Sequence, residues 1–125
     1  MFLIDPLSRT PVYEQIIQQM MRLIENGVLA PGDQIPSVRS LSIDLRINPN
    51  TIQKSYAELD AKGLIQSVPG KGCFVSRDAM ELLKAEKIKR LPELVTLAKD
   101  LLLAGISKDE LIQLIQEIYE KEKPL

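Results

Sequence analysis

The stretch from residue 37 to residue 76 constrains the fold most, because it reads as two short helices followed by a β-hairpin. Ser37 is a suitable N-cap for the first helix, and Asn48, followed by proline, is suitable for the second. Gly63 ends the second helix, and two apolar strands then flank a Pro-Gly-Lys-Gly tip. This order predicts a helix-turn-helix followed by a wing, an arrangement that usually binds duplex DNA.

Upstream of this stretch, apolar residues recur at spacings of three and four and predict one amphipathic helix. Thr10 is its expected N-cap, Pro11 its first residue and Gly27 its C-terminal stop. The apolar run at residues 2–4 is a candidate edge strand. Within the wing, we expect strands over residues 64–68 and 73–76.

From residue 78 onward the pattern is helical, with no strand signal. Pro92 kinks or restarts the helix there, Gly105 stops it, and a capping box from Ser107 to Glu110 opens a last helix. The predicted fold is therefore mostly α with a small β-wing. A winged helix-turn-helix DNA-binding domain spans residues 1–77, and a helical dimerisation segment spans residues 78–125.

Composition excludes several kinds of chemistry. The chain has no histidine, which removes histidine-based acid-base catalysis and most zinc sites. No nucleophile, base and orienting group can be assembled by spacing, so we expect no enzyme activity, metal or cofactor. A single cysteine, Cys73, fits a reducing compartment, and no apolar run is long enough to span a membrane. We therefore expect a cytoplasmic protein without a membrane partner.

Charge supports DNA binding only locally. The formal net charge is −1, which is weak support for a nucleic-acid partner. Residues 37–72 nevertheless hold five basic and three acidic residues, whereas residues 78–125 hold eight basic and ten acidic. This mild segregation permits one face to bind DNA, especially when two copies act together.

The second helix of the motif carries side chains suited to reading bases. Its apolar stripe leaves a polar face that bears Asn50, Thr51, Gln53 and Lys54. Asn and Gln pair bidentately with adenine, Thr contacts a thymine methyl or a phosphate, and Lys reaches guanine or phosphate. A solvated helix face is the alternative, but the preceding turn and the following wing favour DNA.

Two further sites are candidates for phosphate contact. Ser37 and Arg39 begin the first helix, where a helix N-terminus and a guanidinium both attract phosphate. A capping serine and a surface arginine are an equally good explanation. The tip at Gly70, Lys71 and Gly72 lets the backbone approach DNA closely, or it is an ordinary glycine turn. We expect Gly72→Val to weaken DNA binding and leave the fold intact.

The apolar stripes of residues 80–119 are expected to be buried against another protein surface. They either cap the core of the winged domain or form a homodimer interface, and we favour the interface because that domain has its own core. The predicted interface residues are Leu82, Leu83, Leu94, Leu101, Leu111, Ile115 and Ile118.

The chain resembles the GntR family of transcriptional regulators, and within it the short YtrA-type subgroup. Six blocks carry this resemblance in the expected order and cover most of residues 2–77, namely PVYEQI (11–16), GDQIPSVR (32–39), NPNTI (48–52), YAEL (56–59), KGLI (62–65) and GKGCFV (70–75).

The resemblance implies a winged helix-turn-helix that binds palindromic operators as a homodimer, with DNA contacts at Ser37, Arg39, Asn50, Thr51, Gln53 and the wing tip. Cys73 departs from the threonine common in such wings. We therefore expect a repressor whose partner is double-stranded operator DNA, with its small-molecule effector unknown. The alternative is a winged-helix module that binds protein rather than DNA.

Overall fold

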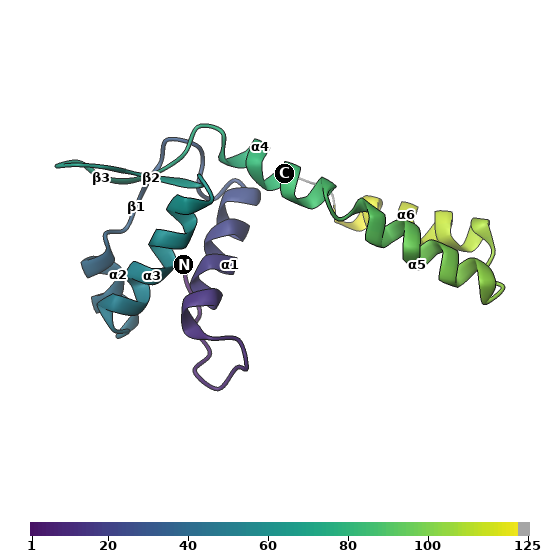
Figure 1. Cartoon of the computed structure of the whole chain (residues 1–125), viewed down its shortest axis with the longest axis horizontal. Helices are drawn as coiled ribbons and strands as arrows, with labels where there is room; N and C mark the ends of the chain where they lie inside the picture. The colour runs from purple at the N-terminus through teal and green to yellow at the C-terminus, as the bar shows by residue number, and fades with distance from the viewer. Residues whose placement is uncertain (123–125) are drawn as a thin grey trace. The chain divides into compact units, whose positions relative to one another are not determined.

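The computed structural model describes residues 1–122 as six α-helices and one three-stranded antiparallel sheet (Figure 1). No helix in this range is long and apolar enough to cross a membrane. The chain divides into two compact units, residues 1–83 and 84–125. The predicted class, mostly helical with a small β-wing, is confirmed. The elements are α1 (Val12–Glu25), β1 (Gln34–Ile35), α2 (Val38–Leu45), α3 (Pro49–Ala61), β2 (Ile65–Val68), β3 (Gly72–Val75), α4 (Ala79–Ile88), α5 (Leu91–Leu103) and α6 (Lys108–Lys121).

The first unit packs α1, α2 and α3 around one hydrophobic core. Ile16, Met20 and Ile24 of α1 lie against Ile52 and Leu59 of α3, and all five side chains are essentially inaccessible to solvent. Burial of each such side chain contributes about 1.5–3 kcal/mol. This core sets the orientation of α3 and so decides which of its residues remain outside.

Side-chain caps begin three of the helices, as the sequence predicts. The Ser37 hydroxyl accepts from the Ser40 amide at 3.0 Å, and Asn48 Oδ1 accepts from the Asn50 amide at 2.8 Å. Ser107 caps α6 by accepting from the Glu110 amide at 3.2 Å. The prediction for Thr10 was wrong, because Pro11 is the N-cap of α1 and makes no side-chain cap bond.

The N-terminal segment is held by glutamine side chains rather than by strand pairing. Gln19 donates to the Leu3 carbonyl and accepts from the Leu3 amide, and Gln15 does the same with Asp5. Gln15 also donates to the Thr10 carbonyl, while Phe2 is buried in the core. The prediction of an edge strand at residues 2–4 was therefore wrong. The backbone of this segment forms its hydrogen bonds with glutamine side chains of α1 instead of with another strand.

The wing belongs to a sheet with strand order β1-β3-β2. Gln34 of β1 lies opposite Phe74 of β3, and Gln66 of β2 lies opposite Phe74 on the other side. The sequence predicted the hairpin but no strand at residues 34–35. Pairing with β3 makes this segment a third strand and ties the wing to the entrance of α2.

The end of the first unit lies beyond the predicted boundary at 77/78, because the start of α4 packs into the core. Ala79 is fully buried and Leu83 is 6% exposed. Leu82 is half-buried, and its Cδ1 lies 3.2 Å from the position of a β-carbon on Gly63. Both side chains therefore pack against the core of their own chain, and their place in a dimer interface stays a prediction.

The second unit contains α5 and α6, whose side chains bury little within the chain. Neither helix has a buried residue. A new helix, α5, begins next to Pro92, which agrees with the restart that was one of the two predicted alternatives. Its N-cap, Arg90, lies in the right-handed helical region. A proline has no amide hydrogen to bond the preceding turn, which separates α4 from α5. The second unit therefore presents two amphipathic helices with uncovered apolar faces.

Candidate nucleic-acid interface

The exposed face of α3 carries the predicted base-reading residues. Asn50, Gln53 and Lys54 are exposed and Thr51 is half-buried. The opposite stripe of Ile52, Ser55, Tyr56 and Leu59 is buried. The structure thus brings the four polar residues to the first two turns of one helix, on the side away from the core.

Two hydrogen bonds fix the rotation of α3 about its axis. The Ser55 hydroxyl donates to the Tyr13 carbonyl of α1 at 2.9 Å, and the Tyr56 hydroxyl donates to the Pro36 carbonyl at 2.6 Å. Burial raises the pKa of the Tyr56 hydroxyl well above its ordinary value, so it remains a donor. Buried polar groups of this kind are costly to leave unpaired, so these bonds specify one orientation of the helix.

Lys54 differs from its three neighbours because it contacts α1. Its ammonium lies 3.8 Å from the centre of the Tyr13 ring, within the range of a cation–π interaction. The Tyr13 hydroxyl donates to Glu14 Oε1 at 3.1 Å, and this bond raises the pKa of Tyr13. Lys54 is therefore held at the flank of α3 that faces α1.

The start of α2 presents a hydroxyl and a guanidinium to solvent. The Ser37 oxygen accepts the capping bond from Ser40, which leaves its hydrogen free to donate to a phosphate. Arg39 is exposed on the first turn of α2. Both residues thus lie at the N-terminus of α2, where the positive end of the helix dipole also attracts anions.

The wing tip is a tight turn with left-handed glycines. The Lys71 amide donates to the Val68 carbonyl at 3.0 Å, and Gly70 and Gly72 have φ of 76° and 122°. Gln34 of β1 donates to the Lys71 carbonyl at 3.1 Å, so the tip is tied to the third strand. The Lys71 side chain remains exposed.

Gly72→Val would introduce a backbone strain that the sequence alone did not reveal. A β-carbon at Gly72 would lie 2.6 Å from Gln34 Nε2, in a backbone conformation that suits glycine. The substitution would therefore strain the wing turn, so a loss of DNA binding could come from a distorted wing as well as from a lost contact.

Lys71→Ala is the better test of the wing, because it removes one exposed charge and no packing. We expect an unchanged melting temperature and a severalfold weaker affinity for all DNA sequences, since a lysine at a phosphate reads no base. Thermal melting and fluorescence anisotropy measure the two quantities. Lys108→Gln, on α6, is the matched loss of one charge, and equal effects of the two changes would place the wing away from DNA.

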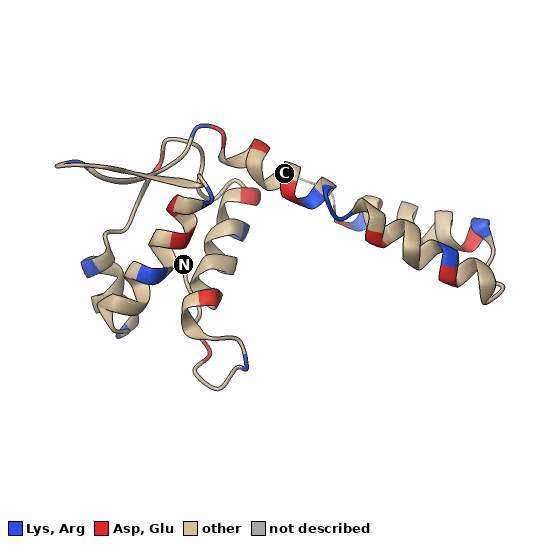
Figure 2. Cartoon of the chain, in the orientation of Figure 1, with Lys and Arg blue, Asp and Glu red and all other residues tan. Residues whose placement is uncertain are grey.

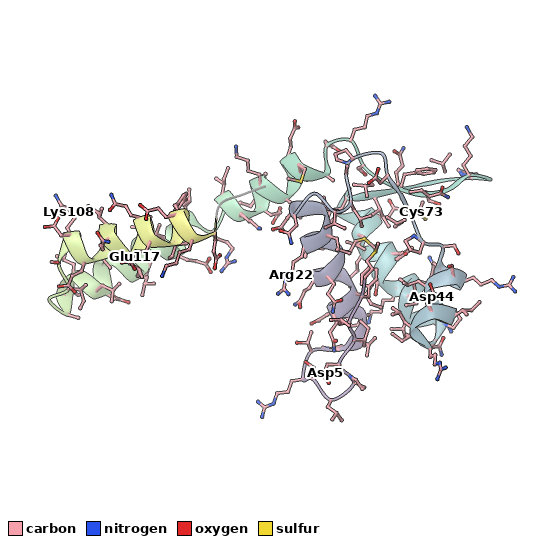
Figure 3. All side chains as sticks on the ribbon, turned by 180° about the vertical axis from the view of Figure 1, so that it is seen from behind. Asp5, Arg22, Asp44, Cys73, Lys108 and Glu117 are labelled. Atoms are coloured by element: carbon pink, nitrogen blue, oxygen red, sulfur yellow. The ribbon has the colours of Figure 1, made fainter. Side chains whose placement is uncertain are left out.

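A small groove joins α3 to the wing and was not predicted. It has a volume of about 250 Å³ and is lined by residues of α2, α3, β2 and β3, among them Gln53, Ser67 and Cys73. Cys73 is half-buried on β3 (Figure 3). No sequence spacing relates Gln53 to the wing, since only the turn of the chain after Gly63 brings the hairpin back along α3.

Basic residues lie on each element of this candidate interface. Figure 2 shows Lys and Arg on α2, α3 and the wing. Arg39, Lys54 and Lys71 are the exposed cations on these three elements. The same three elements form a winged helix-turn-helix, and in such domains the second helix of the motif enters the major groove.

Comparison with known proteins assigns this arrangement to a family. The model of "Bacterial regulatory proteins, gntR family" matches residues 12–75, which run from the start of α1 to the end of the wing. The chain belongs to the GntR family. The match covers every element that carries a candidate DNA contact.

Similarity to individual GntR proteins extends beyond the winged unit. The chain is 43% identical over 119 residues to the HTH-type transcriptional repressor YtrA of Bacillus subtilis, covering 94% of this chain and 92% of that protein. A transcriptional regulator from Oenococcus oeni has a similar crystal structure, with a TM-score of 0.73, 29% identity and coverage of 92% and 96% of the two chains. Both similarities therefore include the C-terminal helices.

A third relative was solved with DNA. The DNA-binding domain of AraR in complex with operator ORX1 matches with a TM-score of 0.54 and 31% identity, over 60% of this chain and 93% of that one. This match covers a smaller share of the chain than the two similarities described above. The resemblance to short GntR regulators that the sequence predicts is thus confirmed.

Proposed function

We propose that this chain is a transcriptional repressor that binds operator DNA in a sequence-specific manner as a homodimer. The observation that supports this most is the exposed polar face at the start of α3, oriented by buried bonds and flanked by a wing. The name of the B. subtilis relative supports repression, and the operator complex of AraR supports DNA as the partner. As a regulator of genes, the protein would act in the cytoplasm.

In this proposal each part of the interface has one task. Asn50, Thr51 and Gln53 read base edges in the major groove, where amide side chains recognise adenine. Ser37, Arg39 and Lys54 contact phosphates on either side of α3. The wing, with Gly70, Lys71 and Gly72, approaches a neighbouring groove or backbone. Contacts to phosphates position the protein, and contacts to bases specify the site.

We propose that the second unit forms the dimer interface. Leu94, Ile115 and Ile118 are each about half exposed within one chain, and Leu101 and Leu111 are partly covered. Contiguous apolar faces that a single chain leaves exposed often mark an interaction surface. A second copy would cover them. It would also place two copies of α3 on a palindromic site, because the two-fold symmetry of the protein matches that of the operator.

Selection from a random-sequence duplex pool tests this function directly. The protein should enrich a palindromic site, and its affinity for the selected duplex should exceed that for an unselected duplex of equal length. Affinity should also fall steeply with salt, because bound phosphates release counterions. A protein that enriches no sequence and binds no duplex would leave the protein-binding alternative.

Two substitutions separate base reading from phosphate binding. We expect Gln53→Ala to cost roughly 1–3 kcal/mol on the selected duplex and little on the unselected one, since one base contact is lost. Arg39→Ala should weaken both duplexes alike. Anisotropy titrations of each variant against both duplexes provide the measurement, and an equal loss on both for Gln53→Ala would refute its base-reading role.

A further inference from the structure

The turn between α2 and α3 contains an arginine in a conformation that suits glycine. Arg46 has φ 56° and ψ 45°, which is the left-handed helical region. It is the one non-glycine residue with positive φ among residues 1–122, and all six glycines of the chain have positive φ. At every other described left-handed position the residue is therefore glycine, which adopts this region without steric cost.

The turn itself does not use the Arg46 side chain. The amides of Arg46 and Ile47 both donate to the Ser42 carbonyl, and the Ser42 hydroxyl donates to the Ile47 carbonyl at 2.6 Å. The Arg46 side chain is exposed and makes no hydrogen bond or ion pair within the described chain. Glycine would make the same backbone bonds at lower energy, so nothing within the chain accounts for an arginine.

The position of Arg46 relates it to the candidate interface. It follows the last residue of α2 and precedes Asn48, the N-cap of α3, by two residues. It therefore lies at the end of α3 that carries Asn50 and Thr51. When a helix enters the major groove by its N-terminal turns, phosphates flank that end. A guanidinium there can bind a phosphate through two parallel hydrogen bonds.

We infer that Arg46 is a phosphate-binding residue of the DNA interface. This contact would explain why the turn contains an arginine with a strained backbone rather than a glycine. Strained residues of this kind concentrate at functional sites. The inference rests on the proposed function, because it needs DNA as the partner. It adds a contact that the resemblance to the family does not supply.

Arg46→Gly tests the inference, because it removes the guanidinium and relieves the backbone at the same time. We expect the melting temperature to stay equal or to rise. Affinity should nevertheless fall severalfold for both the selected and the unselected duplex, since a phosphate contact reads no sequence. The slope of log affinity against log salt concentration should decrease by about 1, as expected for one lost phosphate contact.

Arg46→Lys and Lys108→Gln are the controls. The lysine variant keeps the charge and the strained backbone, so it should recover most of the affinity and the full salt slope. Lys108→Gln, on α6, removes one charge elsewhere and should leave the slope unchanged. Normal affinity and slope in Arg46→Gly would overturn the inference, and so would a lower melting temperature, which would make the arginine structural. Absence of salt-dependent binding by the unmodified protein would instead refute the proposed function.

Discussion

Truncation after Ile88 should give a folded monomer whose affinity for the selected duplex is about 10²–10⁴-fold weaker than that of the full chain. The truncated chain keeps all of α4, and with it the buried residues Ala79 and Leu83. It loses α5 and α6, which have no buried residues of their own. Without them each half-site is bound separately, since the second binding event is no longer intramolecular.

Light scattering and anisotropy on the two chains measure this effect. Truncation after Arg77 is an informative companion, because it also removes Ala79 and Leu83 from the core. That shorter chain should melt at a lower temperature than the one ending at Ile88. A truncated chain that still dimerises would place the interface elsewhere, and a full chain that is monomeric at micromolar concentration would refute the proposed homodimer.

Leu83→Asp should impair folding, whereas Leu94→Asp should impair assembly. Leu83 is 6% exposed in the core of the first unit, so an unpaired carboxylate there should lower the free energy of unfolding by roughly 3–5 kcal/mol. Leu94 is 52% exposed within one chain. A carboxylate there should leave the winged unit stable, and it should dissociate the dimer.

Urea unfolding and light scattering on both variants separate the two outcomes. Because the same chemical change is made at each position, the difference reports only the environment of the leucine. If Leu94→Asp remained a dimer, α5 would lie outside the interface. A fully stable Leu83→Asp would contradict the packing of α4 on the first unit.

Local sequence patterns were sufficient for most elements of the winged unit. The caps at Ser37, Asn48 and Ser107 were predictable because each bonds an amide two or three residues ahead. The buried stripe of α3 was predictable from its helical spacing, and the exposed face that includes Asn50 and Gln53 followed from it. Such features depend on neighbours along the chain, so sequence spacing contains them.

Features that join distant segments were not predictable in the same way. The pairing of Gln34 with Phe74 makes β1 a strand, and the bonds from Gln15 and Gln19 replace a strand at the N-terminus. The contact of Lys54 with Tyr13 separates this lysine from the other polar residues of α3. Each depends on which surfaces meet after folding, and a short apolar run cannot specify its partner.

The amino-acid sequence by itself determined the order of the elements, the polar face of α3 and the family resemblance, because these follow from spacing and turn chemistry within short segments. Only the tertiary structure decided that Leu82 and Leu83 pack against the core of their own chain, and that Gly72 has a backbone conformation that suits glycine. It alone also showed the left-handed backbone of Arg46. Burial and backbone strain depend on contacts between segments far apart in sequence, and hydrophobic spacing is the same for a leucine in a core and a leucine at an interface.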